Sequence, residues 1–114
     1  MEHQMDLNPS PFSKIKNGTK TIELRLYDEK RRKISKGDTI RFCNTENANE
    51  TILAKVIDLY IFDSFEELYK TLPLLECGYT EDDVCNASPK DMDRYYSIER
   101  QQKFGVVGIH ITVI

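Results

Sequence analysis

The segment Thr21 to Leu26, TIELRL, alternates without exception between polar and apolar side chains. A period of two is typical of a β-strand, in which successive side chains point to opposite faces. We therefore predict a strand whose isoleucine and two leucines pack in the core. Glu23 and Arg25 should point away from that core together, about 7 Å apart along the strand. Lys20 lies at the strand entrance, so the three charged side chains predict a polar groove that faces a ligand.

The rest of the chain is expected to form short strands and short helices. Alternating runs bounded by turn residues predict strands, and apolar residues at helical spacing behind a capping side chain predict helices. Further strands are expected at residues 3–6, 39–42, 51–62 and 106–114, helices at residues 12–16, 28–33 and 65–71 and after Thr80 and Ser97, and a polar loop at residues 44–49. The helices inserted before the last strand favour an α+β fold. We expect a small mixed sheet of five to six strands, curled toward a barrel and surrounded by short helices, as a single domain over residues 1–114.

The charge of the chain is unevenly distributed. The formal net charge is −3, yet residues 1–42 contain ten Lys and Arg against six Asp and Glu, while the remainder contains six against thirteen. The first part therefore favours a local positive patch on an acidic protein, and the overall charge argues against a protein that coats nucleic acid indiscriminately. The acidic second part keeps a protein-interaction module open as an alternative function.

Features of secreted and membrane proteins are missing from the sequence. No run approaches 18 apolar residues, and the N-terminal residues lack a basic region followed by an apolar one. Cys43, Cys77 and Cys85 cannot all pair with one another, and they lack zinc-site spacing. We therefore expect reduced thiols in a cytoplasmic protein, and we favour a monomer.

Neither a metal nor a cofactor is expected. His3 and His110 lie at opposite ends of the chain, with no partners at the spacing of a metal site. The glycine-rich loops that bind nucleoside triphosphates or dinucleotides are also missing.

Several segments, taken in order, resemble one protein family. These are NGTKTIELR, KISKGDTIRF, a helix beginning FEEL, and YYSIERQQKFGVVGIHI, which together extend from about Phe12 to Ile111. In this arrangement the chain resembles the ASCH domain, a member of the PUA-like superfamily. The resemblance implies a small β-barrel with helices around it and a groove that holds the polar side of the GTKTIELR strand. It also implies RNA binding, by the likeness of ASCH domains to PUA domains.

A distantly similar bacterial branch of the ASCH family is an amidohydrolase that removes the acetyl group from acetylcytidine, using a lysine, a threonine and a glutamate. The resemblance places the lysine on Lys20 and the glutamate on Glu76. The threonine falls on Glu23, which cannot act as a hydroxyl nucleophile, and Thr21 is displaced from that position by about 7 Å along a strand. The catalytic candidates, if the protein is an enzyme, are therefore Lys20, Glu76 and Thr21.

Two functions follow from these residues. The first is binding of RNA or a nucleoside, in which cations reach phosphates, a carboxylate accepts from a base amino group and an aromatic ring stacks on a base. The candidate ligand-binding residues are Lys20, Glu23, Arg25, Arg31, Arg32 and Tyr96. The second is deacylation of a modified pyrimidine nucleoside. In a third interpretation the charged strand binds no ligand, and its side chains form ion pairs along one wall of the fold.

Overall fold

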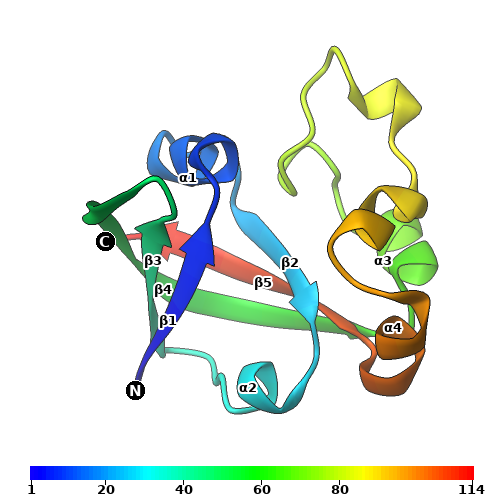
Figure 1. Cartoon of the computed structure of the whole chain (residues 1–114), viewed down its shortest axis with the longest axis horizontal. Helices are drawn as coiled ribbons and strands as arrows, with labels where there is room; N and C mark the ends of the chain where they lie inside the picture. The colour runs from blue at the N-terminus through cyan, green and yellow to red at the C-terminus, as the bar shows by residue number, and fades with distance from the viewer.

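Five β-strands form one mixed sheet in the computed structural model, which describes residues 1–114 (Figure 1). In the sheet order β1-β3-β4-β5-β2, the strands are β1 (Glu2–Leu7), β3 (Thr39–Asn44), β4 (Asn47–Phe62), β5 (Val106–Val113) and β2 (Ile22–Leu26). The connecting helices are α1 (Pro9–Lys16), α2 (Glu29–Arg32), α3 (Phe65–Thr71) and α4 (Ile98–Phe104), with two 3₁₀ helices, η1 (Val84–Asn86) and η2 (Pro89–Arg94). None of the helices is long and apolar enough to cross a membrane.

The sheet curls because β4 is long and bent. This strand of 16 residues pairs antiparallel with β3 along its first part and with β5 along its second part. Its register with β5 shifts between Val56 and Asp58, and a bulge of this kind bends a strand and increases its twist. β1 pairs in parallel with β3. The result is a mixed half-barrel with short helices around it, which confirms the expected α+β fold.

The hydrophobic core has two parts, which lie on opposite faces of the sheet. In the first part, Phe12 and Ile15 of α1 pack against residues of β1, β3, β4 and β5 on the inner face of the curl. In the second part, Phe65 and Leu68 of α3 pack against β2 and the start of β5. Figure 1 shows that the segment from α3 to α4 lies on the other side of β2 from α1. β2 therefore separates the two parts of the core.

Because of this position, β2 is buried on both faces. In its antiparallel pairing with β5, Glu23 lies opposite Ile109 and Arg25 lies opposite Val107. Residues directly opposite each other on two paired strands share a face, so both charged side chains point to the inner face, beside the first part of the core. The predicted alternation is correct. The prediction that Glu23 and Arg25 point away from the core is wrong, because the helical segment covers the aliphatic face and leaves the charged face inside the curl.

The helix starts predicted at Ser64 and Ser97 are correct, because each serine caps its helix. Ser64 accepts a hydrogen bond from Glu67 N at the start of α3, and Ser97 accepts one from Arg100 N at the start of α4. The helix predicted after Thr80 is wrong. There the Asp83 carboxylate accepts from Thr80 N over 2.6 Å, and the chain forms a turn that leads into η1. Short acidic side chains compete for backbone N–H groups in this way.

The polar loop predicted at residues 44–49 is also wrong. β3 and β4 extend into it and leave only Thr45 and Glu46 as a hairpin turn. Asn44 stabilises this turn, because its side-chain oxygen accepts from Glu46 N over 3.0 Å.

Candidate functional site

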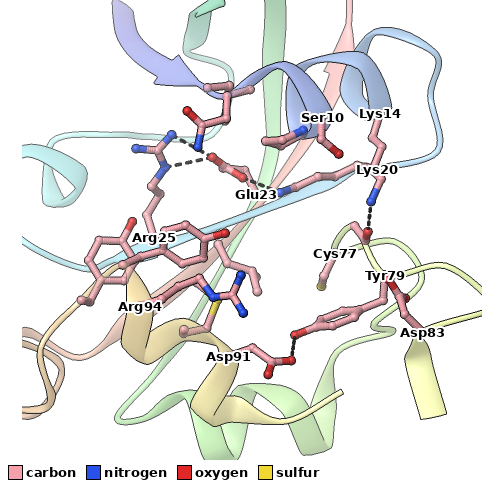
Figure 2. Close-up of a pocket in the computed structure, with 18 of the residues that line it drawn as sticks. Ser10, Lys14, Lys20, Glu23, Arg25, Cys77, Tyr79, Asp83, Asp91 and Arg94 are labelled. Carbon is pink, nitrogen blue, oxygen red and sulfur yellow. Dashed lines mark hydrogen bonds and ion pairs between the residues drawn. The ribbon is translucent and has the colours of Figure 1, made fainter. Parts of the chain in front are cut away.

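A cleft of about 690 Å³ lies between the N-terminal elements of the chain and the segment that connects α3 to α4 (Figure 2). One wall comes from the end of β1, from α1 and from β2, and the other comes from residues 77–96. The polar and aromatic side chains that line it include Asp6, Ser10, Lys14, Lys20, Glu23, Arg25, Tyr69, Cys77, Tyr79, Asp83, Asp91, Arg94, Tyr95 and Tyr96. The volume lies within the range of natural small-molecule sites.

Lys20, Glu23 and Arg25 form a buried ion cluster on the first wall. Lys20 Nζ lies 2.8 Å from Glu23 Oε1, and Arg25 Nε donates to Glu23 Oε2 over 2.9 Å. The Glu23 residue is only 3% exposed, although one face of the cluster lies on the cleft. The sequence prediction that these three residues lie together is therefore matched by their positions.

The two cations keep the Glu23 carboxylate ionised. Burial alone would raise the pKa of Glu23, but the positive charges and hydrogen bonds of Lys20 and Arg25 outweigh it, so that the pKa lies below its ordinary value. Burial would likewise lower the pKa of Arg25, and the charge of Glu23 reverses that effect. At neutral pH the cleft therefore presents two cations that share one carboxylate.

Arg25 also joins the two edge strands of the half-barrel. Its Nη2 donates to Asp6 O at the end of β1 over 2.8 Å, although β1 and β2 are not neighbours in the sheet. The remaining nitrogen, Nη1, makes no hydrogen bond within the protein. It can therefore donate to a ligand without disturbing the ion cluster.

A chain of hydroxyl groups lines the second wall. Tyr79 donates to Asp91 over 2.7 Å, the Tyr69 and Tyr79 hydroxyl oxygens lie 2.7 Å apart, and Ser88 N donates to the same carboxylate oxygen over 3.1 Å. Burial raises the pKa of both tyrosines, so they stay protonated. These hydrogen bonds hold η2 and the segment after α3 in one rigid wall.

The rim of the second wall combines aromatic rings with a cation. Tyr96 is half-buried and stacks on Phe65 at 6.2 Å between ring centres, whereas Tyr95 is 58% exposed. Arg94 is exposed and forms no ion pair or hydrogen bond within the protein. The Arg94 guanidinium lies over the Tyr95 ring at 6.0 Å, and both side chains are exposed to solvent at the cleft. A ligand can contact this exposed pair.

Only two of the three catalytic candidates, Thr21 and Glu76, contact each other, and they lie apart from the cleft that holds Lys20. Thr21 donates to Glu76 Oε1 over 3.0 Å, and its backbone N–H donates to Glu76 O over 2.9 Å. Neither residue lines the cleft, whereas Lys20 does. The Thr21–Glu76 contact fixes the segment after α3 to the start of β2.

Arg31 and Arg32 lie outside the cleft as well. Arg31 pairs with Asp28 over 3.1 Å on α2. Arg32 lies over the Tyr27 ring at 4.3 Å and donates to Phe104 O over 3.0 Å. Arg31 thus stabilises the start of α2, and Arg32 fixes α2 to the end of α4.

Sequence reasoning missed Lys14, Tyr79 and Asp91 as cleft residues. Lys14 Nζ donates to Gly78 O over 2.7 Å, 64 residues later in the chain. A single lysine on a short amphipathic helix gives no local signal for such a contact. Asp91 carries no motif that marks it, and its bond to Tyr79 spans the segment after Thr80, which was predicted as a helix.

No three His, Cys, Asp or Glu side chains lie close enough together to hold a metal ion. Burial raises the pKa of the Cys77 thiol to about 12, so that it is neutral in the cleft. All three cysteines are free thiols.

Comparison with known proteins gives one family and a small group of solved structures. The sequence model described as "ASCH domain" matches residues 5–114. The crystal structure of hypothetical protein PH0355 is 34% identical, covers 100% of both chains and superposes with a TM-score of 0.82. The solution structure of protein PF0455 from Pyrococcus furiosus is 32% identical, with a TM-score of 0.76, over 100% of this chain and 98% of that one.

A more distant structure has the same fold. A point mutant of ZmASCH from Zymomonas mobilis is 15% identical and has a TM-score of 0.68, over 97% of this chain and 68% of that one. No curated protein matches the chain.

Proposed function

This chain belongs to the ASCH domain family, whose members have PUA-like α+β folds, and we propose that it binds RNA or a nucleoside unit of RNA in the cleft beside Lys20, Glu23 and Arg25. The observation that supports this proposal most is the ion cluster, because it is buried and ionised and yet lies on an open cleft. Removing three charges from water is costly, and well-packed apolar residues in place of buried ion pairs often stabilise a protein at least as well. A ligand that hydrogen-bonds to the cluster gives those charges a function beyond stability.

The cluster has hydrogen-bonding capacity left for a ligand. Lys20 has three ammonium donors and uses one of them on Glu23, and Arg25 keeps Nη1 free. Glu23 Oε1, which contacts only Lys20 Nζ, can accept a second hydrogen bond, such as one from a base amino group. This mixture of donors and a carboxylate suits a base edge and its sugar-phosphate better than it suits an apolar ligand.

The second wall offers a place for the base. Tyr95 is exposed beside Arg94 at the cleft mouth. Aromatic rings and arginine side chains that border a cationic groove are the usual stacking partners of unpaired bases. ASCH domains are also regarded as RNA-binding because they resemble PUA domains. A single unpaired nucleotide, rather than a duplex, is the part of RNA that fits a cleft of this size.

An NMR titration tests the proposal. Short single-stranded RNA is added to ¹⁵N-labelled protein at low and moderate salt, and we expect amide shifts at residues 20–25, 77–79 and 94–96 that weaken as salt rises. Amides of residues 55–61 in β4, away from the cleft, serve as the internal control. Lys20→Met should weaken binding, whereas Lys36→Met, at an exposed pair with Asp58, should not. An unchanged spectrum at high RNA concentration would rule the proposal out.

Deacylation of a nucleoside such as acetylcytidine is the second candidate. The observation that favours it is the contact of 2.8 Å between the Lys20 amine and the Glu23 carboxylate inside the cleft. Water would add to the amide carbonyl and pass a proton to Glu23. Glu23 would return that proton to the leaving nitrogen as the C–N bond breaks, which releases acetate and the nucleoside amine. The lowered pKa of Glu23 makes it a weak base, so we rank this function second. Acetate release from acetylcytidine, followed by ¹H NMR with wild type and Lys20→Met, decides it.

A further inference from the structure

Lys14 and Lys20 bring two ammonium groups to Gly78 at one end of the cleft (Figure 2). Their backbones are joined, because Lys20 N donates to Lys14 O over 3.0 Å. From there the Lys14 side chain ends at Gly78, and the Lys20 side chain passes Gly78 on its way to Glu23. Lys14 Nζ donates to Gly78 O over 2.7 Å, and the end of the Lys20 side chain passes beside the Gly78 Cα.

Gly78 makes this double approach possible. A Cβ added there would lie 3.2 Å from Lys20 Cδ, so that the lysine tail would have to shift by a few tenths of an ångström. Its φ of +113° also lies in the region that only glycine adopts without strain. Gly78 thus supplies a carbonyl to one lysine and space to the other.

The two ammonium groups have donors and charge to spare. Lys14 forms no ion pair, since its one partner is a neutral carbonyl, and Lys20 shares the Glu23 carboxylate with Arg25. The other carboxylates that line the cleft, those of Asp6, Asp83 and Asp91, form no ion pair with either lysine. Each ammonium has three N–H donors and uses one of them within the protein. The two ammonium groups therefore keep four N–H donors for a ligand, and the Lys14 charge has no paired carboxylate.

We propose that Lys14 and Lys20 form a phosphate subsite on Gly78, so that the ligand of the cleft is a phosphorylated nucleoside and not a free one. This inference rests on the proposed function above. Ammonium groups bind phosphate as point charges, and two of them match the double charge of a terminal phosphate. With the phosphate held at Gly78, the base extends toward Arg94 and Tyr95, which line the same cleft. The phosphate comes either from a mononucleotide or from an RNA chain.

Binding titrations with matched ligands test the subsite. The probes are the four ribonucleosides, their 5′-monophosphates, and a short RNA without terminal phosphates. We expect a monophosphate to bind wild type at least about tenfold more tightly than its nucleoside, because about 1.4 kcal/mol is a modest value for a charged hydrogen bond. Lys14→Met should bring that ratio close to one, and Lys14→Arg should restore most of it. Lys16→Met is the control, since Lys16 is exposed on the same helix and does not line the cleft.

The outcomes separate the two proposals. A nucleoside and its monophosphate that bind wild type equally, while both shift cleft amides, would overturn the phosphate subsite and leave the proposed function intact. Failure of every nucleoside, nucleotide and RNA to bind would overturn both. If Lys14→Met weakens the binding of RNA as well as of mononucleotides, the subsite binds internal phosphates. If it weakens the binding of mononucleotides alone, the subsite binds a terminal phosphate. The ¹H–¹⁵N spectrum of each variant verifies that it is folded.

Discussion

Tyr79 donates its phenolic proton to the Asp91 carboxylate over 2.7 Å, and this bond fixes the direction of the hydrogen bonds along the second wall of the cleft. An ionised carboxylate only accepts, and Tyr79 has one proton to give. The Tyr69 hydroxyl, 2.7 Å from that of Tyr79, must therefore be the donor between the two rings. Both phenolic protons are used inside the protein, so the tyrosine oxygens offer only acceptors to the cleft. The lysine and arginine side chains on the facing wall offer donors.

Tyr79→Phe should destabilise the fold, because it removes the central member of this chain. We expect a loss of about 1–2 kcal/mol in the free energy of unfolding, measured by urea denaturation, since a hydrogen bond to a charged group is lost and Asp91 keeps only its bond from Ser88 N. Tyr95→Phe is the control, because the Tyr95 hydroxyl is exposed and makes no hydrogen bond within the protein. Equal stability of the two variants would show that the Tyr79–Asp91 bond does not hold the wall.

Glu23→Gln should destabilise the protein more strongly than any surface substitution. The amide keeps the shape of the side chain but leaves Lys20 and Arg25 buried without a counter-charge, at a cost of about 3 kcal/mol in the free energy of unfolding. Glu66→Gln is the matched control, since Glu66 pairs with Lys70 on the surface of α3 and should contribute less than about 0.5 kcal/mol. A Glu23→Gln variant as stable as the control would contradict the role of Glu23 as a buried counter-ion.

The alternation TIELRL was enough to predict β2 and to group its charged residues, because a period of two has one structural meaning. The alternation could not tell which face of β2 lies inside the curl. That depends on the pairing of Glu23 with Ile109, 86 positions later in the chain, and on helices that cover the other face.

The start of α3 at Ser64 could also be predicted from the sequence, because apolar residues at helical spacing follow the capping serine. The acidic residues after Thr80 have no such apolar face, and they form a turn. Lys14 is the clearest example of a residue whose role could not be predicted from the sequence. Its contact with Gly78 exists only after two distant segments have packed together.

Acid should weaken the attachment of β1 through Asp38. The Asp38 carboxylate lies 2.8 Å from His3 Nε2 and accepts from Ser35 N over 3.0 Å, and these bonds lower the pKa of Asp38 from 3.8 to about 2. A carboxyl group with a lower pKa in the folded state stabilises the fold above its unfolded pKa and loses that effect as the pH falls through the folded one. The Asp38 contribution should therefore disappear between about pH 4 and pH 2.

Thermal unfolding measured across this pH range checks the prediction. Asp38→Asn should flatten the dependence of the melting temperature on pH, whereas Asp82→Asn, at an exposed carboxylate without a hydrogen bond, should leave it unchanged. Parallel curves for Asp38→Asn and wild type would show that Asp38 titrates normally.

Gly78→Ala should separate the backbone requirement at this position from the requirement for space beside Lys20. Gly37 is the matched control, since its φ of +91° is also positive but an added Cβ there would meet nothing within 4 Å. Both alanine variants force a side chain into the left-handed region and should lose about 1–2 kcal/mol in the free energy of unfolding. Only Gly78→Ala also pushes on the Lys20 tail, because its Cβ would lie 3.2 Å from Lys20 Cδ.

In titrations with a ribonucleoside monophosphate, we therefore expect Gly78→Ala to weaken binding and Gly37→Ala to bind as wild type does. Equal affinity for the two variants would mean that the position of the Lys20 ammonium does not matter to the ligand.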